Sequence, residues 1–431
     1  MILGQVSWLD CFVFLLFLAP QLIIHVGFFP TLFCGIKALP FLFIRLPLNF
    51  LYERLLITKE HQPPFVQQAS WFEDVVIRCV RYAFASIPAE IGKVFFSKGA
   101  ATPFLRWRML RHGFLRKPVH WEEIKKKDFE GIWIIKDKTK PPDVVVYYAH
   151  GGGFSMGTSH FYLEFLLAFH SLLCSSTHTS PTQFSNPAIL ALEYTLVPKA
   201  SYPTQLHQSI AGYKYLLSKT HDPSRIILSG DSAGGTLILS LLLHIGNTQP
   251  KSKAGKKIKA IQDSGSDIQG VTPGLAVLIS PWTTLVSSKD VNTKSDYLDA
   301  NNLHHYARQY IGSQNSPNDP LISPGNCKDA AWWRRACPSK GVFVIWGKEE
   351  VFAPEIREWV KLLEREEVDV EKREEEDGIH AWPVASLFLS SVREERIKGL
   401  VRMVRFIGER MGDGSKGGDV VEVREKDVAR L

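Results

Sequence analysis

Two glycine-rich segments follow directly after apolar runs and have the composition of sites for acyl transfer. The first is GDSAG, Gly230 to Gly234, between the apolar run RIILS and an apolar stretch with helical character. A Gly-x-Ser-x-Gly sequence in a strand-to-helix turn lifts a serine hydroxyl above the edge of a sheet. This placement predicts Ser232 as a nucleophile. A helix that begins at Ala233 would direct its N–H groups, and the positive end of its dipole, toward negative charge that develops beside the serine.

The second segment is HGGG, His150 to Gly153, and it follows the run VVVYYA. Three consecutive glycines weaken regular structure, because glycine loses more conformational freedom on ordering than any other residue. Attack on an acyl carbonyl creates an oxyanion, which N–H donors stabilise from about 2.7–3.1 Å. Bare backbone allows that approach, so we expect the amides of Gly152, Gly153 and Ala233 to form an oxyanion hole, with His150 and Gly151 supporting the loop. The alternative is two unrelated glycine turns.

A serine hydroxyl also needs a base to accept its proton and an acid to orient that base. On a sheet that carries such a turn, the chain order is serine, acid, histidine. His380, in the sequence GIHAWP, is the only histidine downstream of the candidate acids, so we predict it as the base. We predict Glu350, which follows the apolar run VFVIW, as the acid; Glu349 is the second candidate. Asp377, next to a glycine, is expected to be a turn residue.

Apolar runs that alternate with helical stretches must position these groups. Runs that are apolar throughout are typical of strands covered on both faces, and their alternation with helices favours a mostly parallel sheet with helices on both faces. The fold class is therefore α/β. The predicted strands are Ile132–Ile135, Val144–Tyr148, Ala188–Tyr194, Arg225–Ser229, Leu275–Ile279 and Val342–Trp346, with an edge strand near Val368–Lys372. The predicted helices are Trp71–Phe84, Phe161–Leu173, Gln205–Ser218, Ala233–Ile245 and Pro354–Glu366.

The N-terminal segment is strongly apolar. From Trp8 to Ile36 it contains one acidic residue, Asp10, and neither lysine nor arginine. That length suffices for a membrane-spanning helix, so residues 1–36 are predicted to be a single transmembrane anchor. A signal peptide and a buried core helix are the alternatives. The absence of a basic N-terminal region disfavours a signal peptide. The apolar character on every face disfavours a core helix. Ala38–Ile57 contains prolines and charges, which favours an interfacial helix or a lid. Residues 37–130 are predicted to form a hydrophobic helical cap.

The remaining composition excludes several classes of function. The net charge of +7 arises largely from five lysines in KSKAGKKIKAIQDSGSDIQG, so residues 250–270 are predicted to be a loop insertion and the charge does not indicate a nucleic-acid partner. The six cysteines match neither a metal site nor a disulfide framework, and no metal or cofactor is expected. Residues 412–431 are predicted to be a poorly ordered tail.

Five motifs together (HGGG, EYTLVPKASYP, GDSAGG, SPW and GIHAWP) resemble the hormone-sensitive lipase-like branch of the α/β-hydrolase family. The similarity is greatest to membrane-anchored steryl acetyl hydrolases and arylacetamide deacetylase-like enzymes. It implies an α/β-hydrolase domain over residues 131–411, with the family's nucleophile at Ser232, its acid at Glu350 and its base at His380. Most of the family has aspartate where this chain has Glu350.

These observations predict a serine hydrolase that cleaves carboxylic esters. The resemblance implies short-acyl or acetyl esters of hydrophobic alcohols such as sterols. Two alternatives stay open: a biosynthetic hydrolase or acyltransferase, and a small-molecule binding protein without activity. The anchor predicts a membrane location, with the endoplasmic reticulum expected; the terminal Ala429-Arg430-Leu431 resembles a peroxisomal address and provides the alternative.

Overall fold

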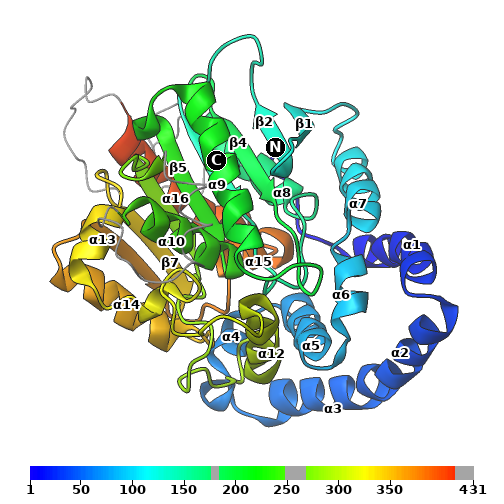
Figure 1. Cartoon of the computed structure of the whole chain (residues 1–431). Coiled ribbons are helices and arrows are strands. Elements are labelled where there is room, and N and C mark those ends of the chain that lie inside the picture. Colours follow the sequence, from blue (N-terminus) through cyan, green and yellow to red (C-terminus); the bar gives the residue numbers. More distant parts are fainter. Residues whose placement is uncertain (176–183, 248–267, 413–431) are drawn as a thin grey trace.

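An eight-stranded sheet forms the centre of the computed structural model, which describes residues 1–175, 184–247 and 268–412 (Figure 1). The strand order is β1-β2-β4-β3-β5-β6-β7-β8. Strand β2 is antiparallel to both of its neighbours, and the pairings from β4 through β3 to β8 are parallel. The strands are β1 His120–Lys125, β2 Glu130–Ile135, β3 Val145–Ala149, β4 Ala188–Glu193, β5 Ile226–Asp231, β6 Leu275–Ile279, β7 Val342–Gly347 and β8 Val370–Glu375.

The predicted strands are all present, within a few residues of their expected bounds, and the α/β class is confirmed. Strand β1 was not predicted. It is a half-exposed edge strand with the sequence HWEEIK, so it lacks the continuous apolar run that marks a strand buried on both faces. The sheet therefore begins at His120, inside the segment that was expected to be entirely cap.

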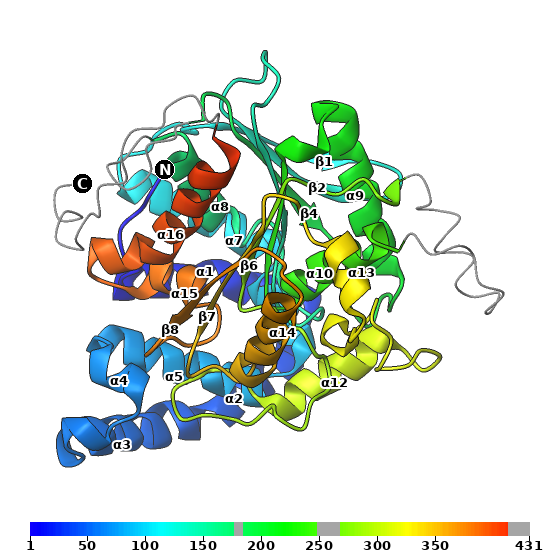
Figure 2. The same cartoon turned by 90° about the vertical axis from the view of Figure 1, so that its left-hand side faces the viewer.

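Helices cover both faces of the sheet (Figure 2). Side chains alternate along a strand, so Tyr147 of β3 packs in one apolar cluster and Tyr148 in the other. The helices on the Tyr147 side are α9 Thr204–Thr220, α10 Ala233–Ile245, α13 Ala330–Ala336 and α14 Ala353–Arg365. Those on the Tyr148 side are α8 Leu163–Leu173, α15 Trp382–Leu389 and α16 Arg393–Met411. Short 3-10 turns lie at η3 Lys59–His61, η4 Pro223–Arg225 and η6 Pro324–Asn326.

A group of helices lies at the carboxyl ends of the parallel strands (Figure 1). They are α4 Pro64–Gln68, α5 Trp71–Ser86, α6 Ala89–Phe95, α7 Lys98–Arg111 and α12 Ala300–Ile311. Helix α5 begins with a capping box, in which the Ser70 hydroxyl accepts the Glu73 N–H at 3.2 Å and the Glu73 carboxylate accepts the Ser70 N–H at 2.7 Å. This confirms the helix predicted from Trp71.

The apolar N-terminus forms two helices where the sequence predicts one. Helix α1, Trp8–His25, ends before Gly27, whose φ of 101° turns the chain. A second, continuous helix then runs through α2 Phe28–Pro40, η1 Phe41–Arg45, α3 Leu46–Leu51 and η2 Tyr52–Leu56. Both helices are long and apolar enough to cross a membrane, a composition that signal sequences and buried helices share.

Three sequence predictions fall largely or wholly outside the described residues. They are the lysine-rich insertion over 250–270, the tail over 412–431 and the terminal tripeptide Ala429-Arg430-Leu431.

Candidate active site

The loops that follow four parallel strands meet at one edge of the sheet. Strand β3 leads into the HGGG segment, β5 into Ser232, β7 into Glu350 and β8 into the loop that holds His380. The carboxyl ends of parallel strands share an edge, which is where α/β proteins bind their ligands. Segments that are far apart in the sequence therefore lie close together here.

Ser232 occupies a strained turn between β5 and α10, as its motif predicts. Its φ of 51° and ψ of −122° lie in a region of backbone conformation that residues other than glycine rarely adopt. The Ser232 N–H donates to the Ile279 carbonyl at 3.1 Å, and the Ser232 carbonyl accepts the Trp282 N–H at 3.1 Å. A Cβ at Gly234 would lie 2.0 Å from the carbonyl oxygen of Ala149. The motif's second glycine is therefore required by the close approach of two backbones.

The HGGG loop presents backbone amides that lack partners. Gly152 has a φ of +114°, and a Cβ there would lie 2.2 Å from the Met156 carbonyl oxygen. The Gly151 N–H donates to the carboxylate of Asp231 at 2.9 Å. Within the described chain, the N–H groups of Gly152, Gly153 and Ala233 donate to no protein atom. These three amides are therefore available to a ligand, as an oxyanion hole requires.

Asp231 ties the serine turn to the glycine loop, and the sequence did not single it out. Its carboxylate accepts hydroxyl hydrogen bonds from Tyr148 at 2.8 Å and from Tyr162 at 2.6 Å, in addition to the Gly151 N–H. Burial raises the pKa of Asp231, and the two tyrosine hydroxyls counteract that rise. The only feature of the sequence that could have indicated this role is that Asp231 occupies the first x of the Gly-x-Ser-x-Gly motif.

His150 holds the glycine loop as a neutral ring. Its Nδ1–H donates to the Gly151 carbonyl at 2.8 Å, and its ring stacks on Tyr194 with centroids 4.3 Å apart. The Tyr194 hydroxyl donates to the His150 carbonyl at 2.7 Å. Burial lowers the pKa of His150 to about 4, so the ring is uncharged near neutral pH. These contacts place His150, and Tyr194 of the EYTLVP motif, against the glycine loop.

The structure brings Glu350, rather than Glu349, to His380. The Glu350 Oε2 atom lies 3.7 Å from His380 Nδ1 and accepts hydrogen bonds from the Ser280 hydroxyl at 2.6 Å and from the Gly347 N–H at 3.2 Å. Both side chains of the pair are buried. Glu349 contributes backbone contacts to this region: its N–H donates to the Gly378 carbonyl.

The separation of 3.7 Å exceeds a hydrogen bond and falls within the range of an ion pair. Burial by itself would lower the pKa of His380, but the Glu350 carboxylate, with Asp296 and Asp231, raises it above its ordinary value. Among the described residues no hydrogen bond joins the Ser232 hydroxyl to the His380 ring. Catalytic hydrogen bonds are often long before substrate binds.

Asp296 holds both of these loops, and no local pattern in the sequence marks it. One carboxylate oxygen accepts the His380 N–H at 3.0 Å, and the other accepts the Val351 N–H, next to Glu350, at 2.9 Å. Its partners lie 84 and 55 residues away along the chain. Ser280, within the SPW motif, makes a parallel bridge, because its hydroxyl donates to Glu350 and accepts the Ala381 N–H at 3.0 Å.

The substitution Asp296→Asn is expected to lower kcat by about 10- to 100-fold with little change in KM, since small displacements of a base are costly. An amide has one accepting oxygen where the carboxylate has two, so one of the two loops loses its restraint. Loss of the charge should also lower the pKa of His380, and the acidic limb of the pH–rate profile should move to lower pH. Steady-state kinetics on a soluble ester measure both effects.

A matched control is Asp290→Asn. Asp290 is a buried carboxylate in the same region, but it pairs with His304 at 2.9 Å and contacts neither loop. Equal losses in the two variants, or an unchanged pH profile in Asp296→Asn, would contradict a role for Asp296 in positioning the base.

Helices α4 through α7 form the cap, and its helix α5 is attached to the loop that contains Asp296. Arg81 of α5 donates to the carbonyls of Lys294 at 2.7 Å, Ser295 at 2.9 Å and Asp296 at 2.7 Å. Phe84 of the same helix contacts Tyr297, with ring centroids 5.5 Å apart, and Tyr297 in turn contacts His380 at 5.9 Å. A continuous series of contacts therefore connects helix α5 to His380.

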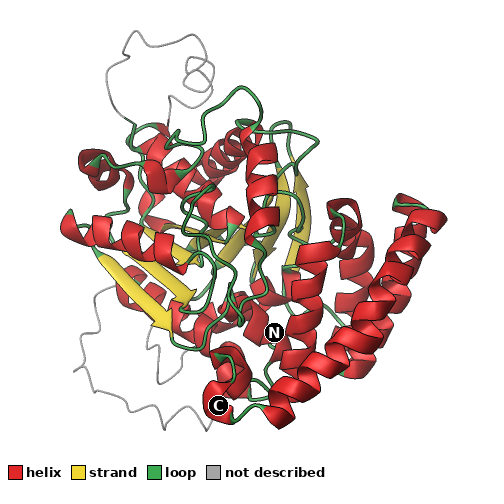
Figure 3. Cartoon of the chain, turned by 90° about the horizontal axis from the view of Figure 1, so that it is seen from below, coloured by secondary structure: helices red, strands yellow, loops and turns green. Residues whose placement is uncertain are grey.

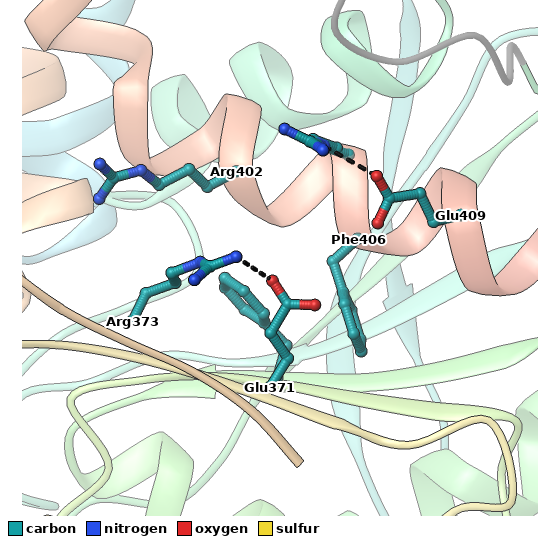
Figure 4. A pocket seen from close by; sticks show the side chains of 7 residues that line it. Glu371, Arg373, Arg402, Phe406 and Glu409 are labelled. Atoms are coloured by element: carbon teal, nitrogen blue, oxygen red, sulfur yellow. Dashed lines mark hydrogen bonds and ion pairs between the residues drawn. The ribbon is translucent and has the colours of Figure 1, made fainter. Parts of the chain in front are cut away.

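Two surface hollows lie away from these residues. One, of about 400 Å³, lies between β8 and α16, and its charges are compensated by the ion pairs Arg373–Glu371 and Arg405–Glu409, each at 2.8 Å (Figure 4). The other, of about 440 Å³, lies beside β2 and the end of β4 and is lined by Lys93, Lys126, Lys127 and Lys199 among others. Neither hollow contains Ser232, Glu350 or His380.

Comparisons with known proteins agree with this fold. A family model described as alpha/beta hydrolase fold matches residues 146–384. Steryl acetyl hydrolase 1 of Saccharomyces cerevisiae is 21% identical over 297 residues, covering 63% of this chain and 61% of that protein. An acetyl-hydrolase of Streptomyces hygroscopicus is 28% identical over 185 residues, covering 42% of this chain and 50% of that protein. The chain therefore spans little more than half the length of these relatives.

A solved structure of an esterase from the bacterial hormone-sensitive lipase family has a TM-score of 0.57 and 21% identity to this chain. The superposition covers 80% of this chain and 99% of the esterase. The expected hydrolase fold and the resemblance inferred from the five motifs are thus confirmed.

Proposed function

Because the chain belongs to the α/β-hydrolase fold family, we propose that it is a carboxylic ester hydrolase with Ser232 as nucleophile. His380 is the proposed base, and Glu350 is the carboxylate that orients it. The amides of Gly152, Gly153 and Ala233 are the proposed oxyanion donors.

In the proposed reaction, Ser232 Oγ attacks the ester carbonyl while His380 takes the hydroxyl proton. The carbonyl oxygen becomes an oxyanion, held by the three backbone amides. The intermediate collapses, the C–O bond to the alcohol breaks, and His380 returns the proton to the leaving alcohol. Water then attacks the acyl carbon while His380 takes its proton; the bond to Ser232 Oγ breaks, His380 returns the proton to that oxygen, and the carboxylic acid is released. Glu350 keeps the imidazole in one orientation and stabilises its charged form.

The observation that carries this proposal is the joint presence of a strained serine and unpartnered amides at one sheet edge. Ser232 adopts a φ of 51°, and Asp231 connects its turn to the Gly151 amide at 2.9 Å. Backbone strain of this kind costs on the order of 1–3 kcal/mol and persists where function needs it. A turn with no chemical task would gain nothing from such an arrangement.

We propose acetyl or other short-acyl esters of hydrophobic alcohols, sterols among them, as substrates. The names of the two relatives refer to acetyl groups, and the yeast protein is named for steryl acetates. The apolar N-terminal helices support a substrate that is dissolved in lipid. They also support a membrane location, for which we propose the endoplasmic reticulum; fractionation against organelle markers, the peroxisome included, tests it.

The full chain, purified in mild detergent, should hydrolyse p-nitrophenyl acetate faster than the butyrate, octanoate or palmitate. It should also release acetate from a steryl acetate. Each assay should include an added alcohol, because transfer of the acyl group to that alcohol would instead indicate an acyltransferase. A folded preparation that neither hydrolyses nor transfers would favour a binding protein and would refute the proposed activity.

A further inference from the structure

The large apolar side chains that are exposed in the described residues are concentrated between Trp8 and Leu56. We call this segment, α1 through η2, the apolar arc. It curves around the cap helices on one side of the molecule (Figures 1 and 3). None of the residues from Phe28 to Leu56 is buried. Exposed apolar surfaces of this extent mark contacts with another protein or with a membrane.

The beginning of the chain is built into the hydrolase body. The N-terminal ammonium of Met1 donates to the Leu167 carbonyl of α8 at 3.1 Å, and the Val6 N–H donates to the Phe388 carbonyl of α15 at 2.8 Å. Met1 and Leu3 are only 8% and 3% exposed. The residues before the arc therefore lie on the same side of it as the catalytic domain.

A buried ion pair fixes the first turn of the arc. Arg108 of α7 is fully buried; it donates to Asp10 at 3.1 Å and to Glu164 of α8 at 2.7 Å. A charge in such a place is stable only with its partners. Asp10 is the one acidic residue of the apolar N-terminus, and it points inward to the body rather than outward to lipid.

Helix α1 lies along the body over its length. Phe14 and Leu18 are buried against Val94 of α6 and Ala100 of α7. With 18 residues the helix is about 27 Å long. Its outer side exposes further apolar side chains, which include Phe12, Leu15, Leu16, Ile23 and Ile24.

The far end of the arc returns to the same body. Arg54 donates to Asp74 of α5 at 2.9 Å, and Arg78 of α5 donates to Glu53 at 2.6 Å. Midway along the arc, the ring of Phe41 stacks on Tyr82 of α5 with centroids 4.1 Å apart. The second helix therefore also runs beside the cap.

From these contacts we propose that the apolar arc lies within one leaflet of a bilayer, roughly parallel to its surface, and does not cross it. A helix that crosses about 30 Å of hydrocarbon has its ends on opposite sides and is enclosed by lipid or by apolar protein. Here both ends and the inner side of the arc are fixed to the hydrolase body. A helix that lies in the membrane–water interface binds the lipid through its outer apolar face and through its basic side chains. The inference rests on the membrane association proposed above, but not on the ester chemistry.

Charge favours lipid over a second protein copy as the occupant of this surface. Lys37 and Arg45 are the charged residues between Phe28 and Tyr52, both are basic, and both are exposed. Basic side chains at this depth can reach anionic headgroups. A dimer interface would cover one face of the second helix, whereas this helix is exposed and apolar on several faces.

The topology can be tested with glycosylation tags at the two termini. The chain contains no Asn-x-Ser/Thr acceptor with x other than proline, so an added tag is the sole reporter. The full chain is inserted into endoplasmic-reticulum microsomes with the tag at the N-terminus or at the C-terminus. Both tags should be in the same state, because Met1 and the last described helix, α16, both pack on the body. Modification of one terminus but not the other would show a single crossing and would overturn the proposal.

A hairpin that crosses twice requires a second measurement. The six native cysteines are replaced by serine, Phe28→Cys is labelled with a fluorophore, and the protein is added to preformed vesicles of phosphatidylcholine and phosphatidylserine. A membrane-impermeant quencher in the outer solution should reach the label. Protection of the label from the outer solution, together with access to a quencher trapped inside, would show that the turn at Gly27 has crossed the bilayer.

Vesicle flotation separates failure of this proposal from failure of the proposed enzyme. Replacing the outward residues Phe12, Leu16, Phe29, Phe43 and Leu48 with serine should lower the vesicle-bound fraction more than tenfold. Hydrolysis of a water-soluble ester should change less than twofold and reports that the variant is folded. The matched control replaces the exposed Leu110, Leu115, Val291 and Val392 and should still float. Equal flotation of the two variants, or an active wild type that does not bind vesicles, would refute the docking surface while leaving the hydrolase intact.

Discussion

Replacing Ser232 with alanine is expected to lower kcat for a soluble acetyl ester by about 10⁴- to 10⁶-fold, because the nucleophile and its base act as one unit. The fold should be unaffected. The contacts that shape the turn are backbone ones, from the Ser232 N–H to Ile279 and from the Trp282 N–H to Ser232, and alanine retains both. The remaining activity would come from the oxyanion donors and from substrate binding. A fluorophosphonate probe should label the wild type and not the variant, and circular dichroism should give the same melting temperature for both.

The control for this experiment is Ser240→Ala on the same helix. Ser240 is also buried, but its hydroxyl donates to the Thr236 carbonyl at 2.9 Å and lies away from the sheet edge. The two substitutions remove the same atom from similar surroundings, so only Ser232→Ala should abolish labelling. If wild type and Ser232→Ala are labelled equally, or if Ser240→Ala loses as much activity, another residue is the nucleophile.

The serine turn and the glycine loop could be predicted because each is encoded by local backbone requirements. A side chain at Gly234 would meet the Ala149 carbonyl, and one at Gly152 would meet the Met156 carbonyl. Such requirements leave only glycine, and they place the glycines next to Ser232 and the proposed oxyanion donors. The strands could be predicted for a related reason, since β3 through β7 are almost entirely buried and therefore consist mainly of apolar residues.

The features that could not be predicted from the sequence either depend on long-range contacts or lie at an exposed edge. Asp296 is a single carboxylate in a polar loop, and only the folded chain shows that it accepts hydrogen bonds from two loops. Strand β1 is polar because it lies at the edge of the sheet. Hydropathy cannot separate a helix that crosses a bilayer from one that lies along a protein, because the difference depends on Asp10 meeting Arg108, 98 residues away.

The substitution Glu350→Gln is expected to lower kcat by about 10³- to 10⁴-fold, because a neutral amide no longer fixes the tautomer of the base or stabilises its charged form. Glutamine has the same size and can still accept the hydrogen bond from Ser280, so the loop should keep its shape. The Glu350 carboxylate contributes most to raising the pKa of His380 above its ordinary value, against the effect of burial, with smaller contributions from Asp296 and Asp231. In the variant that pKa should fall, so the acidic limb of the remaining activity should lie at lower pH than in the wild type.

Glu349→Gln is the neighbouring control, and it should change kcat less than twofold because Glu349 contributes only its backbone to this region. Glu350→Asp adds a graded test. The shorter side chain cannot span the present separation of 3.7 Å without a shift of the loop, so its activity should lie between those of the wild type and Glu350→Gln. A large loss in Glu349→Gln with an active Glu350→Gln would transfer the role to Glu349. If the acidic limb of the pH–rate profile does not shift in Glu350→Gln, the Glu350 carboxylate does not affect the pKa of His380. The proposed triad would then lack its acid.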